Sequence, residues 1–247
     1  MQETTESKAK AIQRMFSRIA PRYDLLNRVL SGGMDRAWRV ALVKAALEKG
    51  PVRILDLATG TGDVALLLKK AAPGVEVIGG DFAPPMLELA RQKARRAGLD
   101  ILFVEADALE LPFPNGYFDA VTIAFGFRNF ADYKKALAEL YRVLAPEGRL
   151  CILEFPPPPR SGLGTLYRFY FTRILPLVGG VISGNPLAYR YLPDSVERFP
   201  DPSTLAAMMT LAGFSTRYRL FTGGIVALHI GDKLSCSTGG VLPDEPS

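Results

Sequence analysis

Short apolar runs alternate with longer amphipathic stretches through the middle of the chain. The runs have the length and composition of buried strands. They are Val52–Ala58, Val75–Asp81, Ile101–Asp107, Phe118–Phe125 and Gly148–Phe155. Between them, apolar residues recur at helical spacing in Asp63–Ala72, Pro85–Gly98 and Tyr133–Leu144. Strands that alternate with such helices form parallel sheets covered by helices on both faces. The pattern therefore predicts an α/β fold with a doubly wound, mostly parallel sheet.

The segments outside this alternating core follow other patterns. Residues 1–50 favour a helical arm, and residues 51–233 contain the main domain. Within that domain, residues 156–200 begin with four prolines and carry arginines among aromatic residues, which we interpret as an inserted lid. A helix that ends at Gly213 and an antiparallel hairpin over residues 215–233 are expected after it. The Ser/Gly/Pro-rich residues 234–247 are expected to form a flexible tail.

Composition and charge restrict the class of protein. The 247 residues are 48% hydrophobic and 22% charged, as in globular enzymes. The formal net charge is +5 without a long basic block, which favours an anionic surface, either lipid or nucleic acid. Two cysteines and the lack of an apolar signal near the N-terminus favour a cytoplasmic protein. No stretch has the roughly 18–20 apolar residues of a membrane-spanning helix.

A glycine loop and several carboxylates are predicted to meet at one edge of the sheet. In "LDLATGTGD", Gly60 and Gly62 allow a tight turn and a close approach of the backbone to a ligand. Parallel strands end at the same edge, so the acidic residues at the strand ends and helix start should converge there. These residues are Asp56, Asp63, Asp81 and Asp107.

The charge of this edge indicates the kind of ligand. A dinucleotide brings a pyrophosphate, which prefers N–H groups and cations to carboxylates. A ligand with a cationic amine, a cationic sulfonium and ribose hydroxyls suits the edge better, and S-adenosylmethionine is such a ligand. Asp81 has the spacing expected for a ribose-binding carboxylate, although the dinucleotide interpretation also uses one there. Asp56 favours S-adenosylmethionine. Asp63 has an alternative interpretation as a helix-start carboxylate that interacts with the helix dipole.

Several longer motifs resemble those of a known family. "LDLATGTGD", "EADALELPFPNGYFDAVTIAFGFRN" and "LYRVLAPEGRLCILEF" resemble class I S-adenosylmethionine-dependent methyltransferases, which have a Rossmann-like sheet. More narrowly, "SRIAPRYDLLNRVLSGGMDRAWR", "AYRYLPDSVERFPDPSTLAAMMTLAGF" and "TGGIVALHIG" resemble the demethylmenaquinone/2-polyprenyl-6-methoxy-1,4-benzoquinol C-methyltransferases. The resemblance covers residues 16–233, and "FGFRN" is much more specific than the glycine loop.

This resemblance implies positions for the cofactor and the substrate. The implied cofactor contacts, beside the glycine loop, are Thr61, Asp81, Asp107, Ala108 and Ala124. Ala124 replaces a residue that is often serine in the family, so its contact must come from the backbone or from packing. The candidate substrate contacts are Tyr23, Asp24, Phe127, Tyr189 and Tyr191. Tyr23 and Asp24 belong to an arm that the resemblance places over the active site, although a helix-start turn that packs this arm on the core explains them equally well.

Arg128 and Asn129 follow the fourth predicted strand and are the candidate catalytic residues. Arg128 stays protonated, so it cannot act as a base, but it can lower the pKa of a ring hydroxyl or hold a water that takes the proton. Asn129 can hydrogen-bond a ring oxygen. The phenylalanines around them, Phe125, Phe127 and Phe130, can supply apolar walls or belong to the core. The alternative is that Arg128 pairs with a structural carboxylate such as Asp132.

The expected reaction is C-methylation of a polyprenylated quinol, most simply demethylmenaquinol to menaquinol, with S-adenosylmethionine as methyl donor. The benzoquinol of ubiquinone synthesis, another small molecule or RNA are alternative acceptors, although no added RNA-binding module is visible. A non-catalytic scaffold in a quinone-synthesis complex is the alternative outside enzymes. The sequence does not indicate the oligomeric state.

The remaining marked residues have simpler interpretations. His229 lies in an alternating strand, which favours a packed imidazole over a general base, and Cys151 is expected to be a buried small hydrophobe. No cluster has metal-ligand spacing, so no metal is expected. Arg168 and Arg173 in the apolar part of the lid, residues 166–182, favour peripheral contact with the anionic inner face of the cell membrane.

Overall fold

The computed structural model describes residues 31–158 and 194–235. In these ranges a seven-stranded sheet has the order β3-β2-β1-β4-β5-β7-β6. The strands are β1 (Arg53–Leu57), β2 (Glu76–Asp81), β3 (Leu102–Glu105), β4 (Phe118–Ala124), β5 (Leu144–Glu154), β6 (Phe214–Phe221) and β7 (Val226–Lys233). The first five pair in parallel, and β7 runs antiparallel to both β5 and β6. The predicted doubly wound sheet with a C-terminal hairpin is therefore confirmed.

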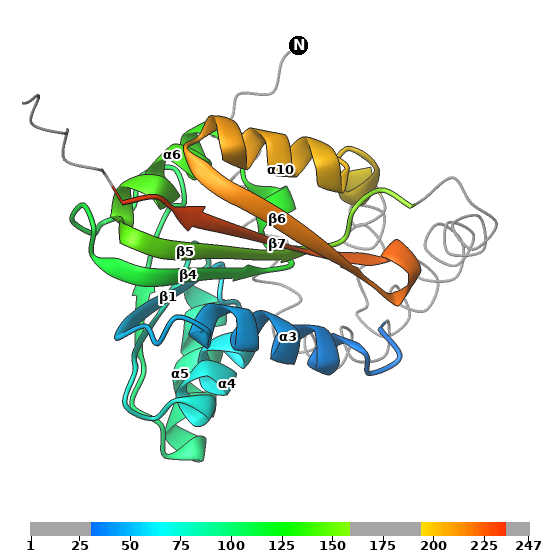
Figure 1. Ribbon diagram of the computed structural model, residues 1–247. Coiled ribbons are helices and arrows are strands. Elements are labelled where there is room, and N and C mark those ends of the chain that lie inside the picture. Colours follow the sequence, from blue (N-terminus) through cyan, green and yellow to red (C-terminus); the bar gives the residue numbers. More distant parts are fainter. Residues whose placement is uncertain (1–30, 159–193, 236–247) are drawn as a thin grey trace, which may run out of the picture.

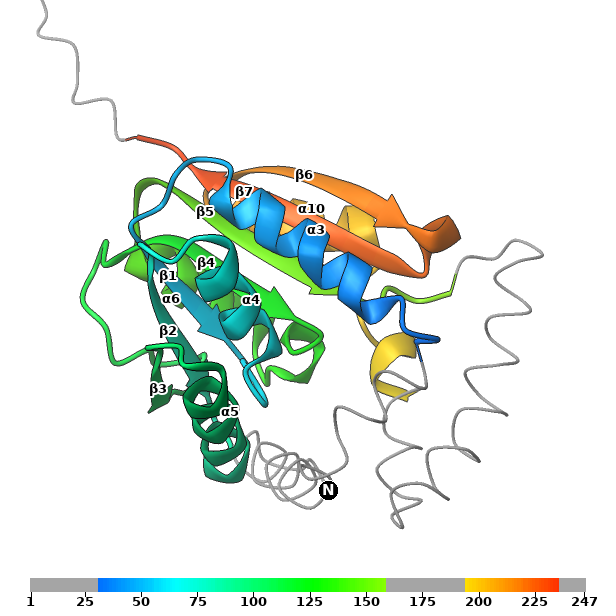
Figure 2. The same ribbon diagram turned by 90° about the horizontal axis from the view of Figure 1, so that it is seen from below.

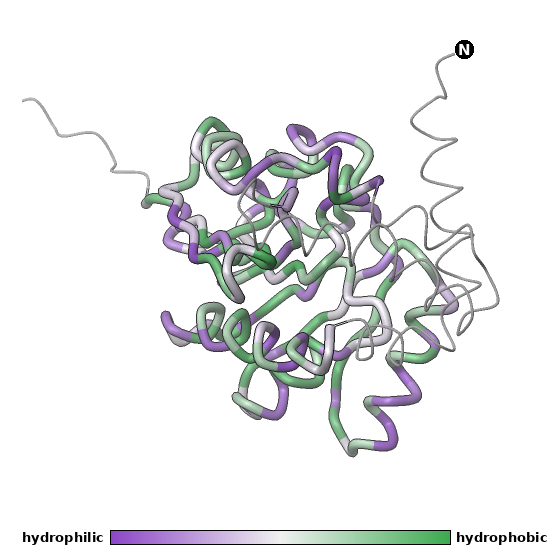
Figure 3. Tube along the Cα trace, turned by 90° about the vertical axis from the view of Figure 1, so that its right-hand side faces the viewer, coloured by the Kyte–Doolittle hydropathy of each residue, from purple (hydrophilic) through white to green (hydrophobic). Residues whose placement is uncertain are grey.

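Helices cover both faces of the sheet (Figure 1). On one face lie α3 (Asp35–Leu47), α4 (Asp63–Ala71) and α5 (Pro84–Ala97), and on the other lie α6 (Tyr133–Val143) and α10 (Pro202–Leu211). Each face has its own hydrophobic core, one built with α3, α4 and α5 and the other with α6 and α10. Hydrophobic and hydrophilic stretches alternate over short distances along the trace, as a two-faced sheet requires (Figure 3).

Local sequence explains where these helices begin and end. Asp132 caps α6 by accepting the backbone N–H of Lys135, and Asp201 caps α10 in the same way through Thr204. α5 has prolines in its first turn and ends at Gly98 in the left-handed conformation. None of the helices in the described ranges is long and apolar enough to cross a membrane.

The predicted division of the chain into arm, domain, lid and tail stays a prediction, because most of the arm, the lid and the tail fall outside the described ranges. One part of the arm is described. Helix α3 packs against β4, β5 and α4, so it forms part of the layer on that face (Figure 2).

Candidate active site

The carboxyl ends of the parallel strands bring the predicted cofactor residues to one edge of the sheet. The glycine loop joins β1 to α4 and turns through left-handed conformations at Gly60 and Gly62. Ala58, directly after β1, and Phe125, directly after β4, are also left-handed although they are not glycines. Such conformations are strained for residues with a side chain and cluster at functional sites. The strain therefore marks the ends of two neighbouring strands.

Asp56 lies beneath the glycine loop rather than on its surface. Its carboxylate is buried and accepts hydrogen bonds from the hydroxyls of Thr59, at 2.5 Å, and Thr122, at 2.7 Å. Burial raises the pKa of Asp56 to about 6. These bonds tie the loop to β1 and β4, a geometry that favours a positioning role, and direct contact with the cofactor amine stays a prediction.

Asp81 at the end of β2 holds the glycine loop from the side. One carboxylate oxygen accepts the backbone N–H of Gly60 at 2.8 Å, and the other accepts that of Ala83 at 2.9 Å. Burial raises the pKa of Asp81, and this effect is larger than that of the hydrogen bonds, which lower the pKa. A carboxylate offers about four lone-pair sites, so Asp81 has the capacity to accept ribose hydroxyls as well.

Asp63 lies in the first turn of α4 between cations from two other helices. Lys93 of α5 donates to its carboxylate at 2.8 Å and to the hydroxyl of buried Thr61 at 2.9 Å. Arg39 of α3 lies 4.0 Å from the other carboxylate oxygen. Asp63 is therefore a helix-start carboxylate that also forms an ion pair with Lys93. Lys93 in turn holds Thr61 and the loop in place.

The other predicted cofactor residues lie at neighbouring strand ends. Asp107 follows β3, is exposed, and accepts the backbone N–H of Leu109, while Ala108 is buried. Ala124 is the last residue of β4 and is partly buried. Their contacts with the cofactor stay predictions.

Arg128 and Asn129 lie in a short 3-10 helix, η2 (Phe127–Asn129), directly after β4. The guanidinium of Arg128 is buried and bonds through Nη1 to Glu154, at 2.8 Å, and to the backbone carbonyl of Phe125. Glu154, the last residue of β5, is fully buried and also accepts the backbone N–H of Arg128. The carboxylate partner of Arg128 is therefore Glu154 and not Asp132, which caps α6 instead.

The phenylalanines near Arg128 separate into two groups. Phe125 stacks on Phe155 at 4.6 Å between ring centroids, and the indole of Trp38 meets both rings edge-on. Phe127 is fully buried and stacks on Tyr133 in the core beside α6. That burial counts against the predicted substrate contact of Phe127, which would require the ring to leave its packing.

Two parts of this edge were not predicted from the sequence. Glu154 had a signal, an acidic residue at the end of an apolar strand, of the kind that identified Asp81. Nothing in the sequence placed Trp38 and Arg39 near the glycine loop, because they reach it only through the packing of α3 in the folded protein. Tyr23, Asp24, Tyr189 and Tyr191 lie outside the described residues.

His229 and Cys151 are packed as expected. His229 is buried in β7, its Nε2 lies 2.9 Å from the carbonyl oxygen of Pro202, and burial lowers its pKa. Burial raises the pKa of the Cys151 thiol to about 12. Among the residues that the structure describes, no group of histidine, cysteine and carboxylate side chains is arranged to hold a metal ion.

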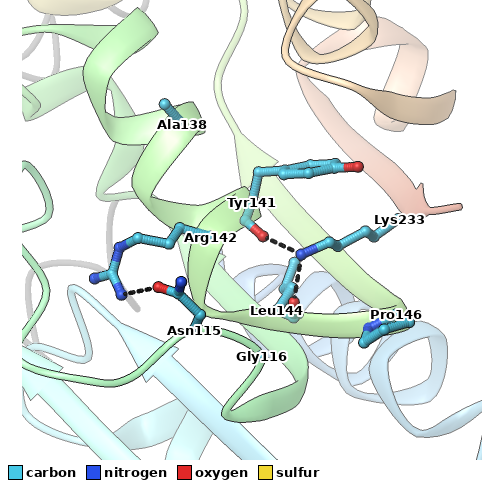
Figure 4. Close-up of a pocket in the computed structure, with 8 residues that line it drawn as sticks. All are labelled: Asn115, Gly116, Ala138, Tyr141, Arg142, Leu144, Pro146 and Lys233. Carbon is cyan, nitrogen blue, oxygen red and sulfur yellow. Dashed lines mark hydrogen bonds between the residues drawn. The ribbon is translucent and has the colours of Figure 1, made fainter. Parts of the chain in front are cut away.

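A pocket of about 500 Å³ lies at the opposite edge of the sheet, by the amino ends of β4 and β5 (Figure 4). Both of its cationic side chains already bond within the chain. Lys233 donates to the carbonyls of Tyr141 and Leu144, each at 2.7 Å, and Arg142 donates to Asn115 at 3.0 Å. This pocket is therefore separate from the candidate active site.

The donor set at the carboxyl edge fits S-adenosylmethionine. The left-handed glycines let the loop approach a ligand closely, and Asp81 stands where ribose hydroxyls are bound in folds of this type. Apolar rings and the buried cation Arg128 lie at the end of β4, and their contact with a substrate stays a prediction.

Comparisons with known proteins agree with this geometry. The sequence profile of the ubiE/COQ5 methyltransferase family matches residues 1–233. The chain is 68% identical to a demethylmenaquinone methyltransferase from Thermus thermophilus over 219 residues, 89% of this chain and 100% of that protein. It is 48% identical over 231 residues to a ubiquinone/menaquinone biosynthesis C-methyltransferase UbiE from Citrifermentans bemidjiense, covering 92% of this chain and 97% of that protein.

Solved structures with lower identity share the fold. A SAM-dependent methyltransferase from Thermotoga maritima, described as a possible histamine N-methyltransferase, is 20% identical and has a TM-score of 0.62 over 89% of this chain and 98% of that chain. The [4+2]-cyclase SpnF has a TM-score of 0.67 at 18% identity, over 91% of this chain and 95% of that chain. At these identities the likeness concerns the fold alone, whereas the profile match covers nearly the whole sequence. The chain therefore belongs to the ubiE/COQ5 methyltransferase family.

Proposed function

We propose that this protein transfers a methyl group from S-adenosylmethionine to a ring carbon of demethylmenaquinol and so produces menaquinol. The observation that carries the proposal is the 68% identity with the Thermus demethylmenaquinone methyltransferase over the whole length of that protein. The geometry supports it, because strained backbone, buried carboxylates and a buried cation converge at the carboxyl edge.

The chain's own residues would first bind and orient the cofactor. The glycine loop offers its backbone, Asp81 accepts ribose hydroxyls, and Lys93 keeps Thr61 and Asp63 in place. Asp56 fixes the loop from below through Thr59 and Thr122. When bound, S-adenosylmethionine would supply an electrophilic methyl group and be left as the neutral thioether S-adenosylhomocysteine, while the acceptor carbon would lose its hydrogen as a proton. The protein must then hold the acceptor carbon in line with that group and exclude water.

Arg128 and Asn129 would act on the acceptor ring. A neutral aromatic carbon is a poor nucleophile, whereas ionisation of a ring hydroxyl moves charge onto the neighbouring carbon. Arg128 favours that ionisation because its guanidinium keeps its charge in a nearly dry setting, where charge interactions are strong. Glu154 holds the guanidinium in one orientation, and Asn129 would hydrogen-bond a ring oxygen.

The benzoquinol of ubiquinone synthesis is the second candidate acceptor. It is favoured by the name of the Citrifermentans relative, which includes both ubiquinone and menaquinone biosynthesis. The two acceptors differ in the fused second ring of one and the methoxy group of the other, but both carry the ring hydroxyls, so the same residues could serve either one.

A direct assay would test the proposal. The purified protein is given methyl-labelled S-adenosylmethionine with reduced demethylmenaquinone, with reduced 2-polyprenyl-6-methoxy-1,4-benzoquinone, or with bulk RNA. We expect label in menaquinol, identified by mass. Label only in the benzoquinol product or only in RNA would overturn the naphthoquinol assignment.

A matched pair of variants would assign the activity to this site. Asp81→Ala should weaken cofactor binding by about 1.5–3 kcal/mol, the range for hydrogen bonds to a charged group. Asp100→Ala, at an exposed position after α5, should bind normally. Equal affinity of the two variants in calorimetry would remove Asp81 from the site.

A further inference from the structure

Arg39 of α3 is a nearly buried cation that the reaction described above does not use. It is 7% exposed. In the described part of the chain, its hydrogen bond runs from Nη1 to Asp35, one helical turn earlier on α3. A buried charge is costly unless it is compensated, and Asp35 supplies that compensation. A guanidinium carries five N–H donors in a planar fork, so one hydrogen bond uses a small part of its capacity.

The guanidinium lies between the glycine loop and the end of β4. Nη2 is 4.0 Å from a carboxylate oxygen of Asp63, and Cζ is 5.6 Å from the ring centroid of Phe125. The neighbouring Trp38 touches Phe125 and is anchored by a hydrogen bond from its indole N–H to the Thr222 hydroxyl at 3.0 Å. Arg39 is thus held between Asp63 on one side and the ring of Phe125 on the other.

Strand order indicates which end of the cofactor lies near Arg39. β1 stands between β2 and β4 in the sheet. If Asp81 at the end of β2 binds the ribose, a cofactor that crosses the loop after β1 brings its amino acid end toward β4. The side chain that reaches this end from α3 is Arg39. Lys93 reaches the loop from α5, which packs over β2 and β3 on the ribose side.

We infer that Arg39 binds the α-carboxylate of S-adenosylmethionine, an inference that rests on the proposed cofactor. The amino acid end carries a carboxylate, and an arginine fork matches a carboxylate better than any other side chain. Asp63 does not repel this carboxylate strongly, because Lys93 pairs with it at 2.8 Å. Asp35 and the ring of Phe125 keep the guanidinium oriented, so little of its freedom is lost on binding.

The test compares S-adenosylmethionine with its decarboxylated analogue in calorimetry on the whole protein. The wild type should prefer S-adenosylmethionine roughly 10- to 100-fold, the range for a hydrogen-bonded pair of charges. Arg39→Met should remove that preference by weakening S-adenosylmethionine alone. Arg39→Lys should keep part of the preference, because it retains the charge without the fork. The matched control is Arg36→Met, which removes an exposed arginine from the same helix and should leave the preference intact.

Other outcomes would overturn the inference and are distinguishable. Equal weakening of both ligands in Arg39→Met, or a loss of thermal stability in Arg39→Lys and Arg39→Met without a change of preference, would assign Arg39 a structural role. Loss of the preference in Lys93→Met but not in Arg39→Met would assign the carboxylate to α5. If the wild type bound neither ligand, the proposed cofactor itself would be wrong.

Discussion

At the scale of single residues, the carboxyl edge of the sheet contains a buried pair of opposite charges. Arg128 and Glu154 form an ion pair in which both side chains are almost completely buried. Removing one partner of such a pair leaves an uncompensated buried charge. The pair therefore fixes η2 to β5 whether or not Arg128 also acts on the substrate, so a test of catalysis must preserve the charge.

Arg128→Lys preserves the charge and loses the planar fork. We expect this variant to bind S-adenosylmethionine normally and to lose kcat by about 100-fold or more, as expected when a preorganised stabilising group is lost. Arg142→Lys is the matched control, because Arg142 also pairs with a glutamate but lies at the opposite edge. Normal turnover in Arg128→Lys, or a joint loss of cofactor binding and folding stability, would contradict a catalytic role.

Asp56 gives a prediction about pH. Burial raises its pKa in the folded protein to about 6, above the ordinary value of 3.8. The folded state therefore binds the proton more tightly than the unfolded state does. This contribution to stability is fully present below pH 3.8 and is lost as the pH rises through 6; it amounts to about 3 kcal/mol at 1.36 kcal/mol for each pH unit.

Asp56→Asn should remove this contribution. The free energy of unfolding of the wild type, relative to that of the variant, should rise when the pH falls from 7.5 to 4.5. Urea unfolding of both proteins at the two pH values measures this difference, in which the other titrating groups cancel. A difference that stays constant with pH would show that Asp56 titrates alike in the folded and unfolded states.

At the scale of elements, the segments that follow β1 and β4 approach each other so closely that position 126 has no room for a side chain. A Cβ atom placed on Gly126 would lie 2.5 Å from the Cβ of Ala58. Gly126 itself has an ordinary φ of −116°, so the constraint is steric and not conformational. Ala58 has a φ of 54°, a conformation that glycine adopts without strain.

A pair of substitutions would test this contact. Gly126→Ala should destabilise the fold by about 1–3 kcal/mol, the range for an overpacked core. Ala58→Gly in the same protein should restore most of that loss, because it removes the colliding methyl group and relaxes the backbone. Urea unfolding of the four proteins in the cycle gives the coupling energy. Additive effects of the two substitutions would show that the collision is relieved elsewhere.

Elements with a clear period were predictable, whereas their irregular ends were not. β1, β2 and β4 follow their apolar runs within one or two residues. β5 begins at Leu144 rather than Gly148, because Leu144 pairs with Phe118 before the register shifts. The turn residues "APEG" concealed this pairing, and Glu147 adopts a left-handed φ of 64° within it.

The candidate site was predictable as far as strand topology determines it. Parallel strands place Asp56 and Asp81 at one edge whatever their side chains contact. The partner of Arg128 was not predictable, because Glu154 is 26 positions away and Asp132 is nearer in the chain. Arg39 was missed for a similar reason, since it reaches the loop only when α3 packs on the sheet.

At the scale of the whole molecule, ionic contacts secure the edge opposite the candidate site. Asp232 of β7 bonds to Arg149 of β5 at 2.7 Å, to Arg217 of β6 at 2.8 Å and to Lys49 after α3 at 3.0 Å. Arg149 also bonds to Glu48. These contacts join the end of α3 and three strands at the edge opposite the candidate site.

A polyprenylated quinol would be dissolved in a membrane, so the protein would meet its substrate at the membrane surface. Arg168 and Arg173 belong to an apolar segment outside the described residues, and the sequence predicts that they meet anionic headgroups. Replacing both with glutamate should weaken binding to vesicles that contain anionic lipid and slow the turnover of long-tailed quinols more than that of short-tailed analogues. In the control, Arg95 and Arg96, exposed residues in the last turn of α5, are replaced with glutamate, which changes the net charge by the same amount. Since any general electrostatic attraction would weaken equally in both variants, equal losses would refute a specific contact, and unaltered vesicle binding would refute the membrane role of these two arginines.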